Sequence, residues 1–484
     1  MDRIIIVGGG FTGCSAAVQL VRASAEPVDI AIVEPRTELG RGAAYSTTDL
    51  DHRLNGSSGT HFVDPADPEA LPRWCEATRL LERDPEARAP NGQLYVRRAD
   101  FARFVAGQVD AHLTNANGSA VRHLRDRAIA AREAGAEWEV QLAGGRKLRA
   151  RLVVIATGTG AIRVPWPFDG ELASHPSFAA DPFDAARVRA TRTRARVLIV
   201  GAGLTSLDIA STLLRQGHEG PITVLSRHGQ RPRPQRPPGP DTTSARLFER
   251  LAAAPPDFIM PASRSARGML RAMRARIREV ERQGGDWYGP FDDVRDSVWK
   301  VWPRLDAAEK RRFLVKVRPW YDIHRFRTPP QNDAMVREAE SAGRIAFVRG
   351  RLQRASALDD VLRVEWRDGG APPVSRDFDA VINCTGLDAS CGARDNPLLA
   401  ALVAQGTIRP DPSGFGFEVD AQCRPIAANG RAVERLRIFG PPTAGTFGDP
   451  LGVLFIAPQV RRAIDGMLAD LVHAPAPRNT AAAG

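Results

Sequence analysis

Residues 3–13 read RIIIVGGGFTG, and this stretch decides the fold. A short apolar run leads directly into Gly8, Gly10 and Gly13, and a helical pattern of apolar residues follows. The first glycine of such a turn permits tight bending, the second lets the backbone approach a pyrophosphate, and the third allows close helix packing. The stretch therefore predicts a strand, a phosphate-binding turn and a helix whose N-terminus faces the phosphates.

The next apolar run supports this interpretation. Residues 28–33 form a second predicted strand that ends at Glu34, which lies 26 residues after Gly8. A carboxylate at the end of the second strand can accept hydrogen bonds from both hydroxyls of a ribose. We therefore predict that the first unit binds a dinucleotide, and we assign FAD to it.

A second strand-turn-helix unit begins near residue 197. Gly201 and Gly203 repeat the turn, Thr205 follows, and Ser206 replaces the third glycine. Counting 26 residues from Gly201 reaches Arg227, the position that matches Glu34 in the first unit. An arginine there, beside Ser226 and His228, suits the 2′-phosphate that a carboxylate would repel. The second nucleotide is therefore predicted to be NADPH rather than NADH.

Two short segments link the units. Ala156-Thr157-Gly158 and Cys384-Thr385-Gly386 each end a buried apolar run, and both resemble the A-T-G signatures at the domain crossings of two-nucleotide flavoproteins. We therefore expect an α/β fold with two Rossmann-like domains, the NADPH domain being inserted in the FAD domain. The predicted boundaries are 1–165 and 375–473 for the FAD domain, 190–374 for the NADPH domain with a helical insertion at 232–318, and 474–484 for a disordered tail.

Composition narrows the class of protein. The chain has 484 residues, 43% of them hydrophobic, and a formal charge of +11. The arginines are spread along the sequence and lysines number only four, so we expect no nucleic-acid partner. The five cysteines form no C-x-x-C pair and no metal-ligand spacing, so neither a metal site nor a redox cysteine pair is predicted. No leader or membrane-spanning run is recognisable, and we expect a cytoplasmic protein.

Several motifs resemble those of a known family. The sequence resembles the FAD/NAD(P)-binding family of YdhS-like proteins, which implies fold and cofactors more than it implies a reaction. The segments that carry the resemblance are residues 39–45 (LGRGAAY), 52–55 (HRLN), 203–208 (GLTSLD), 225–229 (LSRHG) and 324–327 (HRFR). By this resemblance Arg41 contacts the cofactor.

A wider resemblance bears on the reaction. Phe168, Gly170 and His175 are similar to the fingerprint of class B, N-hydroxylating flavoprotein monooxygenases, although one extra residue precedes His175 and the final aromatic residue is missing. An ordinary interdomain linker is the alternative. In such flavoproteins a strand near the C-terminus runs into a Gly-Asp pair, whereas this chain has Gly440-Pro441. We expect Gly440 to contact the cofactor, with Asp449 as a substitute for the missing aspartate.

The resemblance also implies candidate catalytic and substrate-binding residues. Asn55 matches an asparagine that orients NADP⁺ and the C4a-(hydro)peroxyflavin, and a turn-forming Asn-Gly is the alternative. His324, Arg325 and Arg327 are candidates for holding a substrate carboxylate, and structural salt bridges are the alternative for them.

Three functions remain open at this point. The first is an NADPH-dependent monooxygenase that uses O₂ to hydroxylate the nitrogen of a small amine or amino acid. The second is an NADPH-dependent flavin dehydrogenase or reductase without oxygenation. The third is a non-catalytic flavin sensor or scaffold whose helical insertion binds a partner. The oligomeric state is not predicted.

Overall fold

The computed structural model describes residues 2–112, 118–236, 244–388, 390–449 and 451–472. Its first domain is built on a parallel sheet with the strand order β16-β7-β1-β2-β3. The strands are β1 (Asp2–Val7), β2 (Val28–Val33), β3 (Ala120–Leu124), β7 (Leu152–Ile155) and β16 (Leu436–Ile438). Ile4, Ile5 and Ile6 are fully buried. A continuous apolar run suits a parallel strand that is covered on both faces.

Helices and a small meander complete the first domain. Helix α1 (Phe11–Ala23) packs against α4 (Arg98–Asp110) and against the C-terminal α16 (Val453–Val472). The antiparallel strands β4 (Ala128–Ala134), β5 (Glu137–Leu142) and β6 (Lys147–Ala150) form the predicted meander. Helix α14 (Pro397–Ala404) packs against β4, so the chain has returned to the first domain by this point.

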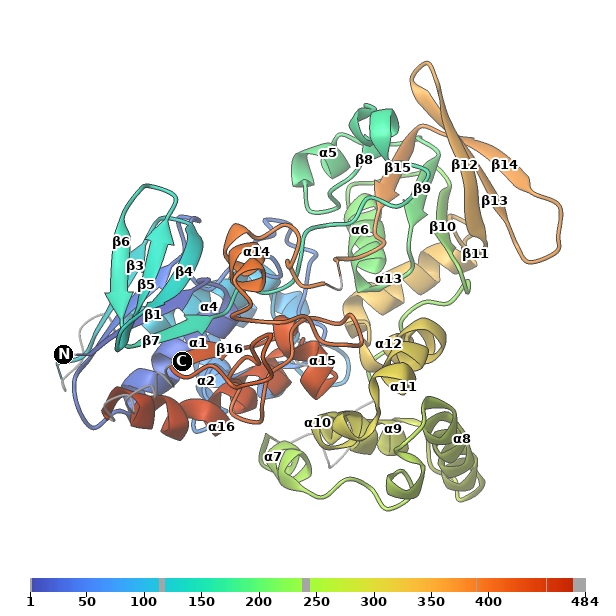
Figure 1. Ribbon diagram of the computed structural model, residues 1–484. Helices are drawn as coiled ribbons and strands as arrows, with labels where there is room; N and C mark the ends of the chain where they lie inside the picture. The colour runs from blue at the N-terminus through green and yellow to red at the C-terminus, as the bar shows by residue number, and fades with distance from the viewer. Residues whose placement is uncertain (1, 113–117, 237–243, 389, 450, 473–484) are drawn as a thin grey trace.

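The second domain has a parallel sheet with the strand order β11-β10-β9-β15-β8. These strands are β8 (Phe178–Ala179), β9 (Val197–Val200), β10 (Ile222–Ser226), β11 (Ile345–Arg349) and β15 (Ala380–Asn383). Helices α6 (Leu204–Arg215) and α13 (Pro330–Ser341) pack together beside it. A second meander contains β12 (Arg351–Leu358), β13 (Val361–Arg367) and β14 (Val374–Phe378). Figure 1 shows the two domains side by side.

The position of β15 differs from the predicted domain boundary. The predicted FAD domain includes residues from 375 onward, but β15 pairs with β9 over residues 380–383 and belongs to the second sheet. The chain therefore returns to the first domain after residue 383 rather than at 375. A four-residue apolar strand can be added to either sheet, and only tertiary pairing selects the sheet; here β15 lies between β9 and β8.

The predicted helical insertion forms a third lobe, seen below the second domain in Figure 1. Its helices are α7 (Ser244–Ala252), α8 (Ala266–Arg282), α9 (Tyr288–Asp296), α10 (Val298–Val301), α11 (Ala307–Arg312) and α12 (Arg318–Arg325), so it extends beyond the predicted end at 318. Trp302 and Lys310 of this lobe each donate a 2.8 Å hydrogen bond to the carbonyl oxygen of Gly445. Gly445 belongs to α15 (Ala444–Phe447) in the C-terminal part, which ties the lobe to the first domain.

Some predicted segments lie outside the described residues: 237–243 of the insertion and the tail at 474–484. Within the described ranges, no helix is both long enough and apolar enough to cross a membrane.

Candidate functional site

The first glycine turn leaves no room for larger residues. Gly8 has a φ of +107°, and a Cβ atom on it would lie 2.3 Å from the carbonyl oxygen of Ala156. A Cβ on Gly13 would lie 1.9 Å from the carbonyl oxygen of Gly8. The side chain of Glu34 is buried and accepts a 2.9 Å hydrogen bond from the backbone N–H of Gly9. The predicted turn and its acidic residue are thus assembled in one cradle.

Neighbouring segments extend this cradle. A Cβ on Gly10 would lie 3.1 Å from the Cα of Gly42, so the loop that carries Arg41 lies directly against the turn. Arg41 itself forms a 2.7 Å ion pair with Glu38. Gly440 has a φ of +75°, and a Cβ on it would lie 2.9 Å from the hydroxyl of Thr12 in the first turn of α1.

One polar atom of the cradle has no protein partner. The hydroxyl of Thr157 is buried and makes no hydrogen bond within the described structure. The adjacent Gly158 has a φ of +76° and open space around its Cα. Because buried hydroxyls are nearly always hydrogen-bonded, an unpartnered one beside a phosphate-binding turn fits a bound dinucleotide.

The second glycine turn repeats the geometry of the first. Gly201 has a φ of +106°, and a Cβ on it would lie 2.3 Å from the carbonyl oxygen of Cys384. Thr385 and Gly386 therefore lie beside the second turn, as Thr157 and Gly158 lie beside the first. The hydroxyl of Ser206 donates a 2.6 Å hydrogen bond to the carbonyl oxygen of Gly203. Thr205 lies next to Ser206 in the first turn of α6.

Basic residues gather at the end of β10. Arg227 and His228 are exposed and follow Ser226, the last residue of the strand. Ser226 is in register with Arg349 at the end of β11. Partial burial and the charges of Arg227, Arg351 and Arg349 lower the pKa of His228, so positive charge from two neighbouring strand ends acts on this imidazole. Arg349 and Arg351 could not be recognised from the sequence, because their proximity to the end of β10 depends on the pairing of β10 with β11.

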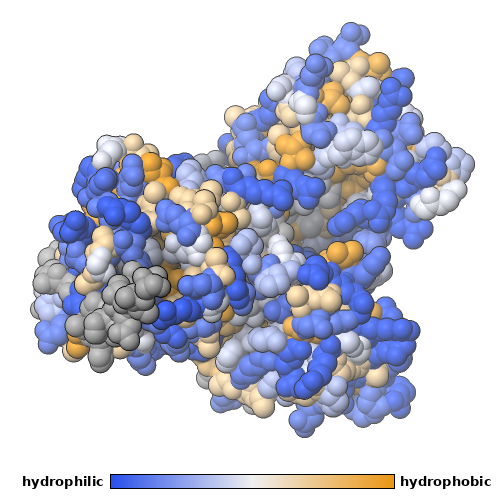
Figure 2. Space-filling view, in the orientation of Figure 1, coloured by the Kyte–Doolittle hydropathy of each residue, from blue (hydrophilic) through white to orange (hydrophobic). Residues whose placement is uncertain are grey.

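A polar pocket of about 160 Å³ lies where the first domain, the helical lobe and the start of α16 meet. Figure 2 shows a hollow in the surface between the second domain and the helical lobe, bordered largely by hydrophilic residues. Three predicted site residues line the pocket together: Asn55, Arg325 and Arg327. The backbone carbonyl oxygen of Asn55 accepts a hydrogen bond from the side-chain amide of Gln235.

The three predicted substrate-binding residues have different environments. His324 does not line the pocket; its Nδ1 lies 2.7 Å from the carbonyl oxygen of Trp320, and its ring lies edge-on to that of Trp287. Arg325 forms a 2.5 Å ion pair with Asp449, and Arg327 forms a 2.5 Å ion pair with Asp292. Both arginines thus have protein carboxylates as partners, as the salt-bridge alternative expected. Asp449 binds the helical lobe, and the described contacts give it no place in the cradle of the first turn.

Residues that the sequence analysis did not select also line the pocket. Arg250 and Arg295 come from α7 and α9, and Tyr95 and His61 come from the first domain. The Nδ1 of His61 lies 3.1 Å from the carbonyl oxygen of Ser57, and burial lowers the pKa of His61 to about 4. No motif marks these residues, because their proximity arises only when the helical lobe folds over the first domain.

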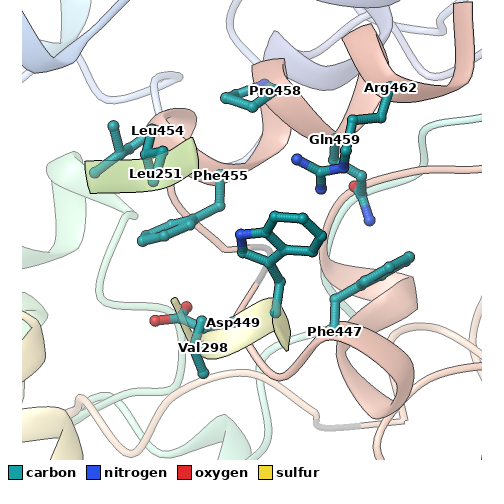
Figure 3. A pocket seen from close by; sticks show the side chains of 10 residues that line it. Leu251, Val298, Phe447, Asp449, Leu454, Phe455, Pro458, Gln459 and Arg462 are labelled. Carbon is teal, nitrogen blue, oxygen red and sulfur yellow. The ribbon is translucent and has the colours of Figure 1, made fainter. Parts of the chain in front are cut away.

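The start of α16 faces the helical lobe across a small apolar pocket (Figure 3). Leu251 lies beside Leu454, while Val298 and Asp449 line the opposite wall. Phe455 lies between them. The guanidinium of Arg325 also lies over the ring of Phe455, with its central carbon 5.0 Å from the ring centre. The lobe therefore contacts α16 near its N-terminus.

The fingerprint-like segment packs in the second domain. Phe168 is fully buried and stacks on Phe178 with ring centres 4.8 Å apart. Gly170 has a φ of +66°. The Nδ1 of His175 accepts a 3.1 Å hydrogen bond from the backbone of Ser177, and its Nε2 lies 3.2 Å from the carbonyl oxygen of Asp359. These contacts suit an interdomain linker.

No group of three or more potential metal-binding side chains occurs in the part of the chain that the structure describes. All five cysteines are buried free thiols. Burial raises the pKa of Cys14 and Cys391 to about 12.

Comparison with known proteins agrees with this geometry. Residues 5–160 match the FAD-NAD(P)-binding family model, and residues 90–236 match the model of L-lysine 6-monooxygenase/L-ornithine 5-monooxygenase. A search of curated proteins found no significant match.

Solved structures share the fold over nearly the whole chain. The ornithine N-hydroxylase of Kutzneria sp. 744 has a TM-score of 0.65 at 16% identity, with 96% of this chain and 99% of that chain covered. The L-lysine 6-monooxygenase of Pseudomonas syringae has a TM-score of 0.64 at 14% identity, with 98% and 100% covered. The FAD-bound cadaverine monooxygenase of Erwinia amylovora has a TM-score of 0.62 at 10% identity, with 97% and 94% covered. The predicted fold class is confirmed, while the narrower YdhS-like assignment stays a prediction. The chain has the fold of the two-dinucleotide-binding flavoproteins, and its N-terminal half is similar to FAD-NAD(P)-binding proteins and to lysine and ornithine N-monooxygenases.

Proposed function

We propose that this chain is an FAD- and NADPH-dependent monooxygenase that hydroxylates the nitrogen of a small amine or amino acid. One observation carries the proposal: the chain forms two glycine cradles whose first glycines, Gly8 and Gly201, have the same geometry, and it also forms a polar pocket that Asn55 lines. The lysine/ornithine monooxygenase match supports the same reaction class.

FAD fits the first cradle. The N–H groups at the start of α1 would bind its pyrophosphate, and Glu34 would accept its ribose hydroxyls. The Arg41 loop, Thr157, Gly158 and Gly440 would complete the contacts, and the free hydroxyl of Thr157 supplies a donor that the protein itself does not use. When bound and reduced, the flavin supplies O₂ activation and the transfer of one oxygen atom.

NADPH fits the second cradle. The start of α6, after Gly203, would bind the pyrophosphate, with Thr205, Ser206, Thr385 and Gly386 around it. At the end of β10, Ser226 and Arg227 would bind the 2′-phosphate, aided by Arg349 and Arg351. The exposure of Arg227 leaves its guanidinium accessible to a ligand.

The protein positions the substrate and excludes water. Asn55 would offer its amide to the nicotinamide or to the substrate, and the link from Gln235 to its backbone holds its loop in place. The helical lobe covers the pocket from the side opposite the first domain. Exclusion of water matters because oxygen that does not reach the substrate is lost as hydrogen peroxide.

A reductase without oxygenation would share both cradles, so the reaction must be measured. Holoprotein is reduced anaerobically with NADPH and then mixed rapidly with O₂ while absorbance is recorded. We expect a transient spectrum that differs from both oxidised and reduced flavin, and hydroxylamine product when amines are supplied. Direct return of oxidised flavin, with all oxygen recovered as peroxide in the presence of every amine tested, would establish the reductase. Absence of any flavin reduction by NADPH would instead favour the sensor.

A further inference from the structure

One face of helix α6 contacts the first domain. Asp208, Thr212 and Arg215 are spaced by four and three residues, so they lie on the same side of the helix. Asp208 forms an ion pair with Arg98. The hydroxyl of Thr212 donates a 2.8 Å hydrogen bond to Asp49. The helix that follows the second glycine turn is therefore docked on the first domain along its length.

The contact at Arg98 is a bridge with two ends. Arg98 is the first residue of α4, and its Nε donates a 3.1 Å hydrogen bond to the backbone carbonyl oxygen of Arg53. A terminal nitrogen of the same guanidinium lies 2.5 Å from the carboxylate of Asp208. The side chains of Arg98 and Asp208 are 14% and 4% exposed. One planar group thus joins residues 52–55 to residues 203–208, two of the segments that carry the family resemblance.

Each end of the bridge lies close to a part of the candidate site. Arg53 is two residues before Asn55, which lines the polar pocket. Asp208 is in the second turn of α6, whose start would bind the NADPH pyrophosphate. Because a helix moves as a rigid body, a displacement of Asp208 also displaces the start of α6.

Helix α4 is in turn fixed against the first glycine turn. The backbone N–H of Gly40 donates a 2.8 Å hydrogen bond to the carbonyl oxygen of Gly9. A Cβ atom on Gly40 would lie 2.7 Å from the carbonyl oxygen of Ala102 in α4. Arg98 is therefore held by an element that packs against the FAD cradle, and its guanidinium reaches from there to the second domain.

The far end of α6 is attached by a different contact. Arg215 lies 2.8 Å from Asp51 and 2.5 Å from Glu86, and the Glu86 side chain is half-exposed. Exposed ion pairs are weakened by water, whereas the Arg98–Asp208 pair is largely shielded from it. If the Arg98 bridge were lost, the end of α6 at Arg215 would stay attached while the end at the glycine turn would become free to move.

We propose that Arg98 is a positioning residue that sets the place of the bound nicotinamide nucleotide relative to the flavin site and the Asn55 segment. This inference rests on the proposed function. The residues that would bind the pyrophosphate and the 2′-phosphate belong to the second domain and do not include Arg98. Arg98 therefore affects the rate of hydride transfer more than the affinity for NADPH.

Hydride transfer is sensitive to such a displacement. A C–H bond of the nicotinamide breaks, and the hydride carries both electrons to the oxidised flavin, which leaves NADP⁺ and the anionic reduced flavin. The reacting atoms must approach to about 3–3.5 Å, so a displacement of about 1 Å can slow the step by about 100-fold.

Variants at both ends of the bridge test the role in hydride transfer. Anaerobic stopped-flow reduction at several NADPH concentrations separates the limiting rate from the Kd. Arg98→Gln should lower the limiting rate by about tenfold or more, with a change in Kd of less than about threefold. Arg98→Gln combined with Asp208→Asn should be no slower than Arg98→Gln alone, because both substitutions break the same bridge. An unchanged limiting rate, whatever happens to the Kd, would overturn the inference.

Two further variants control for general damage. Arg98→Lys keeps a positive charge beside Asp208 but cannot hold both partners in one rigid plane, so a smaller fall of about threefold is expected. This variant decides the matter if Arg98→Gln does not retain FAD. Arg103→Gln is the matched control, because Arg103 is exposed on the same helix and pairs with Asp100 within it at 3.2 Å. Equal effects of Arg98→Gln and Arg103→Gln would contradict the role of the bridge.

A distance measurement tests the placement of the second domain without any turnover. All five cysteines are buried, so spin labels can be attached selectively to Arg146→Cys in the first domain and Arg354→Cys in the second, both at exposed positions. Pulsed electron spin resonance of the holoprotein should show a broader or shifted distance distribution with Arg98→Gln than with Arg103→Gln. Identical distributions would overturn the inference. If NADPH does not reduce the flavin of the unsubstituted protein, the proposed function fails, and the label distances then decide by themselves whether Arg98 places the second domain.

Discussion

The guanidinium of Arg325 and the carboxylate of Asp449 form a buried ion pair of 2.5 Å that joins the helical lobe to the segment before α16. Their side chains are 9% and 4% exposed. The pair lies at the meeting point of the two pockets in this region, because Arg325 lines the polar pocket and Asp449 the apolar one. This buried salt bridge therefore adds to the hydrogen bonds from Trp302 and Lys310 to Gly445 in holding the lobe over the candidate active site.

Asp449→Asn tests this contribution. Loss of one charge leaves Arg325 buried without its partner, so the free energy of unfolding should fall by about 3 kcal/mol. Urea unfolding measures the change. Asp465→Asn is the control, because Asp465 is 87% exposed where it meets Arg461 and should change stability by less than about 1 kcal/mol. Similar values for the two variants would mean that the buried pair does not hold the lobe.

Gly201→Ala should damage NADPH binding and spare FAD binding. The new Cβ would meet the carbonyl oxygen of Cys384 at 2.3 Å, and the residue would have to keep a φ of +106°. We expect flavin reduction by NADPH to slow by about tenfold or more, because this strain moves the phosphate-binding turn. Anaerobic stopped-flow absorbance measures the rate, and flavin content reports FAD. Gly107→Ala, on an exposed face of α4 with no atom within 4 Å of the new Cβ, should leave both unchanged.

Arg227→Ala should change the choice of nicotinamide nucleotide. Removal of a guanidinium that binds the 2′-phosphate should raise the KM for NADPH by about tenfold, with little change for NADH. Steady-state kinetics with both nucleotides measures the ratio. Arg354→Ala, at an exposed position of β12, is the control. An unchanged NADPH-to-NADH ratio would place the 2′-phosphate elsewhere.

His61 should make stability depend on pH. Burial lowers its pKa from 6.5 to about 4, so the folded protein holds the neutral imidazole while the unfolded chain takes up a proton below pH 6.5. Its contribution is therefore complete above pH 6.5 and is lost as the pH falls toward 4. Between pH 7 and pH 5 the loss should be about 2 kcal/mol. Denaturant unfolding of the protein and of His61→Gln at both pH values measures it, and an identical pH dependence in the variant would show that His61 does not titrate this way.

The sequence predicted the parts of the site whose physical requirements are local. A phosphate-binding turn needs glycines at set spacings because a Cβ at Gly8 or Gly201 would collide with a neighbouring carbonyl. This requirement can be recognised from a few consecutive residues of the sequence. Glu34 and Arg227 each lie 26 residues after the first glycine of their turn, so the difference in their charge can also be recognised from the local sequence. The double Rossmann-like fold, the helical insertion and the residues of both cradles could therefore be anticipated.

Other features were decided only by tertiary structure. Strand β15 pairs with β9 and β8 in the second sheet, and its short apolar sequence did not distinguish that position from one in the first sheet. Arg349 and Arg351 lie near His228 because β10 pairs with β11, and Arg250 and Arg295 line the same pocket as Asn55 because the helical lobe folds over the first domain. His324 and Arg325 are neighbours in the chain, yet only Arg325 lines the pocket, since side chains that follow one another on a helix point in different directions. Local backbone geometry thus determined where the nucleotides are predicted to bind, whereas long-range packing determined the charge of the pocket, because that charge is the sum of side chains brought together from distant segments.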